Sequence, residues 1–314
     1  MYNSYVSGSI NAIGKGYMPV GGICGGTKGS ANIENCYNLA SIECKNINET
    51  QYNGNITCGG IAGQISAENS DDNEVVNIEN CFNRRNINAN GGNTLVLVGG
   101  IVGADAENSV NSNINNFYNN AKIQGSTSSN MNRGVGGIVG DLISGNLSNC
   151  YNVGNVIGIK NGDRTSDVSL FMIGGITGIQ GSNSTIYNVF NIGKVTSTNS
   201  SIDLRVGGIT GGIANNATNA SINNAYNTGS IEAEGLSSSQ VGSISGSNLI
   251  TLSNCFYLKG TYSIGVAGSG TVTGVIEWDS IDKFPSVLSV VNEDEVFKED
   301  TNNINNGYPI LDYQ

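Results

Sequence analysis

The sequence contains no histidine, and this absence alone excludes several classes of enzyme. Without an imidazole, the chain lacks the general base of a Ser-His-Asp hydrolase and the ligands of a His-bound zinc enzyme. Basic residues are also few, because 14 Lys and Arg stand against 25 Asp and Glu, and the net charge is −11. A strongly basic nucleic-acid-binding protein is therefore excluded, and we expect no nucleic acid partner.

Proline, charge and long apolar runs are rare as well. Only 3 prolines accompany 45 glycines, and the glycines follow no three-residue period, which excludes a collagen. Charged residues make up 12% of the chain, which is about half the usual share. No window holds 18 apolar residues, so no membrane insertion is expected. Polar residues follow Met1, so we expect no signal peptide at this position.

The seven cysteines contain no Cys-x-x-Cys pair, so the sequence predicts no zinc or iron–sulfur site. Their number is odd and the chain is long, which disfavours a disulfide framework. We therefore expect small, buried thiols. Four of the cysteines recur at one place in a repeat: Cys36, Cys81, Cys150 and Cys255.

Glycine and asparagine are abundant instead, with 45 and 49 residues, and many of them recur at fixed positions of a repeat. The first repeated motif is Gly-Gly-Ile-x-Gly, and its first glycines are spaced 38, 40, 37, 38, 33 and 35 residues apart. Its six full copies and a worn seventh lie at Gly21–Gly25, Gly59–Gly63, Gly99–Gly103, Gly136–Gly140, Gly174–Gly178, Gly207–Gly211 and Gly242–Gly246.

A second motif, apolar-x-Asn-Cys-Tyr-Asn-x-Gly-x-Ile, alternates with the first. Clear copies lie at Asn35–Asn38, Asn80–Asn83, Asn149–Asn152 and Asn224–Asn227. Weaker copies lie at Asn116–Asn119, Asn188–Asn191, Asn254–Phe256 and Asn3–Ile10. Paired motifs at a period of about 36 indicate a repeat architecture.

The residues of the repeat favour strands and turns. Gly and Asn are poor helix formers that suit turns, whereas Ile and Val favour strands. We predict an all-β fold, a parallel β-helix or β-solenoid of about seven coils. Stacked coils place equivalent residues in columns, so we expect hydrogen-bonded asparagine ladders and stacked aromatic rings. The glycines allow either a positive φ or close backbone approach.

The face on which each motif residue lies is left open by simple alternation. Counting from Ile33 places Asn35 and Tyr37 inside and Cys36 outside. The small, apolar residues at the Cys36 position favour the reverse, and a bend at Asn35 would reconcile the two. A ladder of exposed Tyr rings that stacks on sugars is a second interpretation of the aromatic column; core packing is the preferred one.

Insertions separate the motifs, over roughly 43–57, 64–77, 88–96, 124–133 and 159–170, and we expect them to project as polar loops. Clusters of acids in these insertions or at strand ends, one with an arginine, are the candidate ligands or catalytic groups: Asp71, Asp72 and Glu74; Asp105 and Glu107; Asp163, Arg164 and Asp167; Glu232 and Glu234. A glycosidase needs two carboxylates across a cleft, and calcium needs oxygen ligands such as Asp71, Asp72 and Glu74. We expect solvated loops at these places, a surface turn at Arg84-Arg85, and no catalytic, cofactor-binding or metal-binding residue.

The last part of the chain differs from the repeats. Residues 276–314 carry −7 of the net charge of −11. Trp278, Phe284 and Leu288 have helix-like spacing, and Pro285 suits the start of a helix. We predict a β-solenoid over residues 1–275 and an acidic cap over 276–314, part helical and part extended, because an open solenoid end exposes strand edges.

The alternation of Gly-Gly-Ile-x-Gly with Asn-Cys-Tyr-Asn-x-Gly resembles the GLUG-motif repeats of bacterial secreted and cell-surface proteins, with Ile in place of their Leu. The ending Asn305–Leu311 is similar to endings of clostridial-type members. The resemblance covers about residues 1–275 and the tail. It implies an adhesin-like surface protein, or a region beside the protease domain of immunoglobulin-A-specific metallopeptidases, whose zinc motif needs two histidines that this chain lacks.

The sequence therefore favours a non-enzymatic β-solenoid that acts as an adhesin stalk or binding scaffold, outside the cell or on the bacterial surface, as part of a larger protein. A host glycan or a host surface protein is the expected partner. Two alternatives stay open. One is a carbohydrate-active β-helix of the polysaccharide lyase or hydrolase type, and the other is the non-catalytic accessory region of a larger secreted protease.

Overall fold

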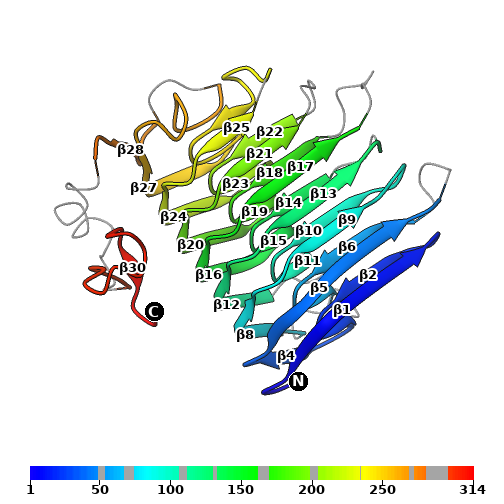
Figure 1. Cartoon of the computed structure of the whole chain (residues 1–314). Helices are drawn as coiled ribbons and strands as arrows, with labels where there is room; N and C mark the ends of the chain where they lie inside the picture. The colour runs from blue at the N-terminus through cyan, green and yellow to red at the C-terminus, as the bar shows by residue number, and fades with distance from the viewer. Residues whose placement is uncertain are drawn as a thin grey trace.

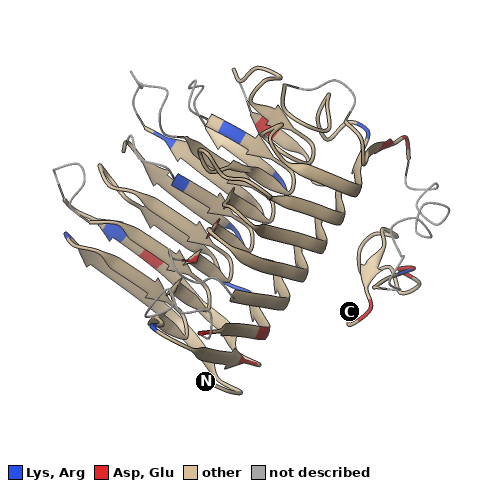
Figure 2. Cartoon of the chain, turned by 180° about the vertical axis from the view of Figure 1, so that it is seen from behind, with Lys and Arg blue, Asp and Glu red and all other residues tan. Residues whose placement is uncertain are grey.

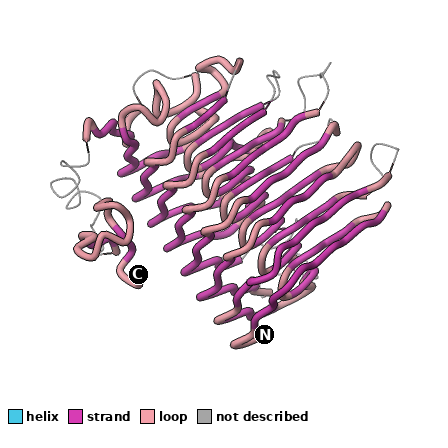
Figure 3. Tube along the Cα trace, viewed as in Figure 1, coloured by secondary structure: helices cyan, strands magenta, loops and turns pink. Residues whose placement is uncertain are grey.

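The computed structural model describes residues 1–48, 54–66, 74–105, 112–129, 133–161, 170–198, 204–233, 235–268, 272–280 and 296–314. Every regular element in these ranges is a strand (Figure 3), which confirms the predicted all-β fold. The strands from β1 to β28 stack into a parallel β-solenoid that begins at the N-terminus (Figure 1). The helix expected after Pro285 lies outside the described residues.

The largest sheet, sheet A, has 15 strands in two parallel rows. The first row contains β4 (Ala31–Glu34), β8 (Val76–Asn83), β12 (Ser112–Asn119), β16 (Gly145–Asn152), β20 (Ser184–Asn191), β24 (Ser221–Asn227), β27 (Thr251–Leu258) and β28 (Val275–Trp278). The second row contains β1 (Tyr5–Gly14), β5 (Tyr37–Asn46), β9 (Ile87–Asn90), β13 (Ile123–Thr127), β17 (Val156–Lys160), β21 (Val195–Thr198) and β25 (Ile231–Ala233). Strand β5 joins the rows, because it pairs with both β8 and β9.

Two further parallel sheets complete each coil. Sheet B contains β2 (Met18–Gly21), β6 (Ile56–Gly59), β10 (Val96–Gly99), β14 (Arg133–Gly136), β18 (Phe171–Gly174), β22 (Leu204–Gly207) and β26 (Val241–Gly242). Sheet C contains β3 (Cys24–Gly26), β7 (Ala62–Ile65), β11 (Val102–Asp105), β15 (Val139–Leu142), β19 (Thr177–Gln180) and β23 (Thr210–Ile213).

Each complete coil therefore has four strands, one from sheet B, one from sheet C and one from each row of sheet A. Sheet C has six strands and sheet B has seven, in agreement with the predicted stack of about seven coils. The loops expected over 88–96 and 124–133 begin later than expected. Strands β9 and β13 occupy the first part of each stretch, up to Asn90 and Thr127, and supply the fourth side of the coil, whereas residues 91–95 and 128–129 are loop.

The core is divided into two lobes. One lobe lies between sheet C and the first row of sheet A, and it holds the motif isoleucines, such as Ile101 and Ile138, which are fully buried. The other lies between sheet B and the second row, and it holds residues such as Ile42, Val98 and Phe171. Apolar burial on this scale is the main stabilising contribution to the stack.

A ladder of asparagines lies where the lobes meet. These residues form the inner asparagine ladder: Asn38, Asn83, Asn119, Asn152, Asn191 and Asn227, all 0% exposed. The Nδ2 of each of the first five donates to the Oδ1 of the asparagine in the next coil over 2.7–2.8 Å. The predicted hydrogen-bonded column is thereby confirmed.

The Gly-Gly-Ile-x-Gly motif makes the corner between sheets B and C, directly against this ladder. No glycine of the motif has a positive φ, so the corner does not need the left-handed conformation. It needs close approach, because a Cβ at Gly60 would overlap Gly100 O and lie 3.0 Å from the Asn83 side chain. Of the two roles offered for these glycines, the structure therefore selects close backbone approach.

The C-terminal segment, residues 296–314, is a small unit beside the stack (Figure 1). Its strands β29 (Phe297–Lys298) and β30 (Ile310–Leu311) pair antiparallel. The segment contacts the flank of the first row of sheet A, at Tyr226 on β24. The end of that row is formed instead by β28, which pairs with β27. None of the described residues belongs to a helix with the length and apolarity needed to cross a membrane.

Candidate binding surface along the aromatic ladder

A left-handed asparagine sets which side chains of the second motif face outward. Asn35 has a φ of 54°, and the equivalent residues Asn80, Asn116, Asn149, Asn188, Asn224 and Asn254 have φ values of 49–60°. Asn accepts this conformation more readily than most residues because its side chain bonds locally. The bend lets Ile33 and Cys36 both point inward, and both are 2% exposed or less. It therefore resolves the conflict in the alternation, as the hypothesis of a bend required.

The residue two positions after each bent asparagine points outward, and these residues form an aromatic ladder. Its members are Tyr37, Phe82, Tyr118, Tyr151, Phe190 and Tyr226. Successive ring centroids lie 4.2–5.3 Å apart with interplanar angles of 2–18°. The column continues where Phe256 stacks on Trp278 at 4.6 Å.

This stacking decides what the ladder can bind. Sugars use the faces of aromatic rings, but both faces of an internal ring such as Tyr118 are covered by its neighbours in the column. Only ring edges and the Tyr hydroxyls face away from the sheet. The edge of an aromatic ring is positive and prefers the face of another ring or a hydrogen-bond acceptor. The geometry therefore suits a protein partner better than a stacked sugar.

The C-terminal segment covers the later half of the ladder. Phe190 and Tyr226 are 0% exposed, whereas Tyr37, Phe82 and Tyr118 are half-buried. Phe297 meets the Phe190 and Tyr226 rings at interplanar angles of 52° and 54°, so these contacts are tilted rather than stacked. The ladder therefore already binds one peptide segment on the side that faces away from the sheet.

Polar contacts fix the segment in place. The Asp300 carboxylate accepts hydrogen bonds from the backbone N–H groups of Ile304 and Asn305, at 2.7 and 2.6 Å, and of Gly307, at 3.0 Å. The turn so formed presents the Asn305 amide, which donates to the Tyr226 hydroxyl at 2.9 Å. The Tyr226 hydroxyl in turn donates to the Pro309 carbonyl.

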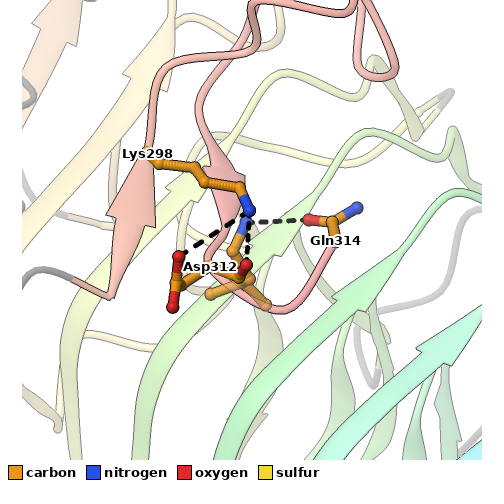
Figure 4. Close-up of polar contacts among 4 residues, drawn as sticks. Lys298, Asp312 and Gln314 are labelled. Atoms are coloured by element: carbon orange, nitrogen blue, oxygen red, sulfur yellow. Dashed lines mark hydrogen bonds and ion pairs between the residues drawn. The ribbon is translucent and has the colours of Figure 1, made fainter.

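The end of the chain folds back on itself near the ladder. Lys298 forms an ion pair with Asp312 at 3.7 Å, and the Gln314 side chain accepts a hydrogen bond from the Leu311 N–H at 2.8 Å (Figure 4). This arrangement places Tyr313 between the segment and the stack. The Tyr313 hydroxyl lies 3.2 Å from the Phe117 carbonyl and 2.8 Å from the Asn149 carbonyl, so it donates to the backbone at the bends.

A cavity of about 390 Å³ separates the segment from the middle of the ladder. Its wall includes Tyr118 and Tyr151 on the ladder side and Ile304 and Tyr313 on the segment side. Arg84 lies at its border, with the guanidinium 4.7 Å from the Phe82 ring centroid. Arg84 also donates to the Tyr118 hydroxyl at 2.6 Å, so this exposed cation belongs to the ladder.

The ladder itself is uncharged at neutral pH. Burial raises the pKa of Tyr151 to about 12, and it raises the pKa values of Tyr226 and Tyr313 as well. Few charged residues lie on the strands of the stack (Figure 2). The Arg84 guanidinium is therefore a local positive charge on a mostly neutral surface.

Three of the carboxylates considered from the sequence lie within the described residues, and the structure does not bring these three together in a site. Glu232 is exposed and forms an ion pair with Lys194. Asp105 is fully buried and accepts a hydrogen bond from Ser112 Oγ at 2.9 Å. Glu74 is half-buried near β8. The remaining candidates lie outside the described residues: Asp71, Asp72, Glu107, Asp163, Arg164, Asp167 and Glu234.

One half-buried acid was not singled out from the sequence. Asp141 on β15 borders a hollow of about 360 Å³, and burial raises its pKa to about 7. Asp105 aligns with the core residues Ile65 and Leu142, whereas Asp141 aligns with Ala104. Side chains of adjacent positions point to opposite faces of a strand, so Asp105 and Asp141 do not flank one ligand. Among the described residues, no three Cys, Asp or Glu side chains are grouped as metal ligands.

The recurring cysteines are buried thiols, as predicted. Cys36, Cys81, Cys150 and Cys255 are at most 1% exposed, and none is in a disulfide. Each thiol donates to the backbone carbonyl two residues before it, over 2.7–3.3 Å, as Cys150 does to Ser148 O. The asparagine between each carbonyl and thiol makes the bend that brings the two together. The column of cysteines therefore has a structural role in core packing.

Comparison with known proteins adds one structural relative. No protein-family model matches the chain, and no curated protein matches it. The chain is similar to the crystal structure of a putative immunoglobulin A1 protease from Bacteroides ovatus, with a TM-score of 0.55 and 19% sequence identity. The likeness covers 91% of this chain and 87% of that chain, and it shows a shared β-solenoid fold.

Proposed function

We propose that this chain is a non-enzymatic binding scaffold of a bacterial protein located outside the cell, and that the uncovered part of the aromatic ladder contacts a host surface protein. The observation that carries the proposal is the docking of the C-terminal segment on the other part of the ladder. Tilted ring contacts and backbone carbonyls hold that segment, as Phe297 and Tyr313 illustrate. A partner strand with an aromatic side chain and hydroxyl or amide donors would use the same contacts.

Arg84 gives this surface its polarity. It is exposed, it lies over Phe82, and it stands at the border between the covered and uncovered parts of the ladder. Its neighbour Arg85 is exposed as well, but it lies at the turn beside the ladder. A partner with a carboxylate or a free carbonyl near its aromatic group would bind Arg84 through a charge-assisted hydrogen bond.

The test is a binding screen of the full chain against host surface proteins and against a glycan array. We expect a protein ligand whose affinity falls at least tenfold in Arg84→Ala and stays within about twofold in the matched control Arg85→Ala, since one charge-assisted bond is worth roughly 1.5–3 kcal/mol. Binding to glycans alone, unchanged in Arg84→Ala, would contradict the proposed surface. No binding in either screen would leave the role of a stalk, which needs no ligand.

A second candidate is the non-catalytic accessory region of a larger secreted protease. The observation that favours it is the likeness to a protein described as a putative immunoglobulin A1 protease over 87% of that protein's chain. The absence of histidine means that this chain would not supply a His-bound zinc centre. A His-Glu-x-x-His sequence encoded in the same gene would support this candidate.

A further inference from the structure

Two cysteines outside the recurring column face each other across the core. Cys44 on β5 and Cys58 on β6 lie in the lobe between sheet A and sheet B, and their sulfur atoms are 3.1 Å apart. Both are buried, with 3% and 0% exposure. The two thiols are reduced in the structure. Their sulfur atoms are already close to the distance from which a disulfide forms with a small change in side-chain torsion.

Comparison of the coils shows that this pair is a coordinated departure from the repeat. The column of Cys44 otherwise holds small residues: Ala12, Ala89, Gly125, Gly158, Ser197 and Ala233. The column of Cys58 otherwise holds β-branched residues: Val20, Val98, Val135, Ile173, Val206 and Val241. Each coil thus pairs a small residue with a β-branched one, and sulfur occurs at both positions in the same coil.

Packing alone does not account for this coincidence. A single cysteine replaces Ala or Val in a core at little cost in volume, and the recurring column shows that use at Cys36 and Cys150. Those thiols donate to a carbonyl of their own strand. Cys44 and Cys58 instead contact each other. Parallel partner strands on both sides hold β5 and β6, so the two sulfur atoms are kept facing one another.

We propose that Cys44 and Cys58 form an intramolecular disulfide when the chain folds in an oxidising compartment. The oxidant is a disulfide, either a small molecule such as oxidised glutathione or a protein oxidoreductase. One thiolate attacks the oxidant to give a mixed disulfide, and the second thiolate displaces it. The S–S bond of the oxidant breaks, that of the chain forms, and the two electrons and two protons leave on two thiols of the reduced oxidant.

The timing follows from burial. Hydrogen bonding to Cys44 and burial raise the pKa of Cys58 well above its usual value, so the folded thiol is a poor nucleophile. An oxidant also has no path to a side chain that is 0% exposed. Oxidation therefore takes place as the coil closes, and the finished solenoid protects the bond from reduction.

The test compares the full chain refolded with oxidised glutathione and with dithiothreitol. Alkylation after denaturation, followed by peptide mapping, should find five free thiols of the seven and a linked pair of peptides that contain Cys44 and Cys58. The oxidised form should melt about 5 °C or more above the reduced form, because the cross-link restricts the unfolded chain. Seven free thiols after oxidative refolding, or a link between other cysteines, would overturn the proposal.

Matched variants separate the cross-link from packing. Cys44→Ala and Cys58→Val place the residues of the neighbouring coils in this coil, so both should fold, and both should lose the difference in melting temperature between oxidised and reduced protein. Cys36→Ala, in the recurring column, should keep that difference. A difference that persists in Cys44→Ala would overturn the proposal. Should either variant fail to fold, the peptide map of the unmodified chain still decides, and its result does not depend on the proposed binding function.

Discussion

Asn119 donates a hydrogen bond from Nδ2 to the Oδ1 of Asn152 over 2.8 Å, one coil further along the solenoid. The bond belongs to a run of six asparagines joined by five such bonds, all of which are donated toward the C-terminal end. At the outward bends a second run donates in the opposite direction, as Asn116 does to Asn80 at 3.1 Å. The two asparagines of one motif therefore form ladders of opposite polarity.

The inner ladder should contribute strongly to stability. Asn119→Ala removes the bonds that the buried Asn83 Nδ2 and Asn152 Oδ1 make to this side chain, so we expect a loss of about 2–4 kcal/mol in the free energy of unfolding. Asn113→Ala, which removes one exposed bond to Asn77, should cost about 0.5 kcal/mol or less. Urea unfolding of both variants measures the difference. Equal losses would contradict the role given to the inner ladder.

The bends should depend on the left-handed backbone. Asn80 is exposed and has a φ of 52°, so Asn80→Ala should cost about 1–2 kcal/mol, the strain of a Cβ in this conformation. Asn80→Gly should cost no more than about 0.5 kcal/mol, because glycine has no Cβ to strain. Thermal melts of the two variants test the pair. A glycine variant that is as unstable as the alanine variant would mean that the Asn80 side chain matters more than its backbone.

Much of the fold could be predicted because it is determined by residues that recur in every repeat. The period of about 36, the inward isoleucines, the asparagine columns and the bend at Asn35 are all properties of a motif that recurs. The fourth strand of the coil could not be predicted in the same way. Strands such as Ile87–Asn90 and Val195–Thr198 are short and polar, and only two residues of each point inward, one of which is small, so they resemble loops.

The place of the C-terminal segment was also beyond the sequence. The segment was expected to cap the open end, but Asn305 bonds to Tyr226 and Tyr313 to the backbone of Phe117, on the flank. These contacts join residues 79 and 196 positions apart, and they depend on a hydroxyl and a carbonyl that become neighbours only after the coils have stacked. The sequence does not reveal the pairing of Cys44 with Cys58, because Cys44 lies beyond the motif in a stretch that resembles a polar insertion.

The glycine corner should tolerate no side chain. A Cβ at Gly137 would overlap the Gly175 carbonyl and lie 2.5 Å from Asn152 Cγ, and neither group can withdraw without breaking the coil. We expect Gly137→Ala to cost about 3 kcal/mol or more, at the upper end of overpacking effects. Gly16→Ala, with nothing within 4 Å, is the control and should stay within about 0.5 kcal/mol. Circular dichroism melts of the two variants measure the difference. Similar melting temperatures for both would show that the corner is looser than the structure indicates.

A charge in the lobe should be more damaging still. Ile138 is 0% exposed and lies among the motif isoleucines. Ile138→Asp buries a carboxylate without a partner, so several kcal/mol should be lost. Ile138→Val, which keeps the apolar character, should cost about 0.5–1.5 kcal/mol. A melting temperature that hardly moves in Ile138→Asp would disprove the inward position of this side chain.

Stability should fall with rising pH because of Asp141. Its pKa is raised by burial from 3.8 to about 7, so the unfolded chain loses this proton first as the pH rises. Between about pH 4 and pH 7 the folded state therefore binds more protons, and the free energy of unfolding decreases across this window and levels off above it.

Asp141→Asn keeps the shape of the protonated acid and removes the titration. The variant should match the unmodified chain near pH 4 and exceed it by about 1–3 kcal/mol at pH 8. Asp105, whose pKa burial also raises, is present in both proteins, so its contribution is largely common to them. Urea unfolding at pH 4, 6 and 8 gives the two curves, and parallel curves would show that Asp141 is solvated as an ion in the folded chain.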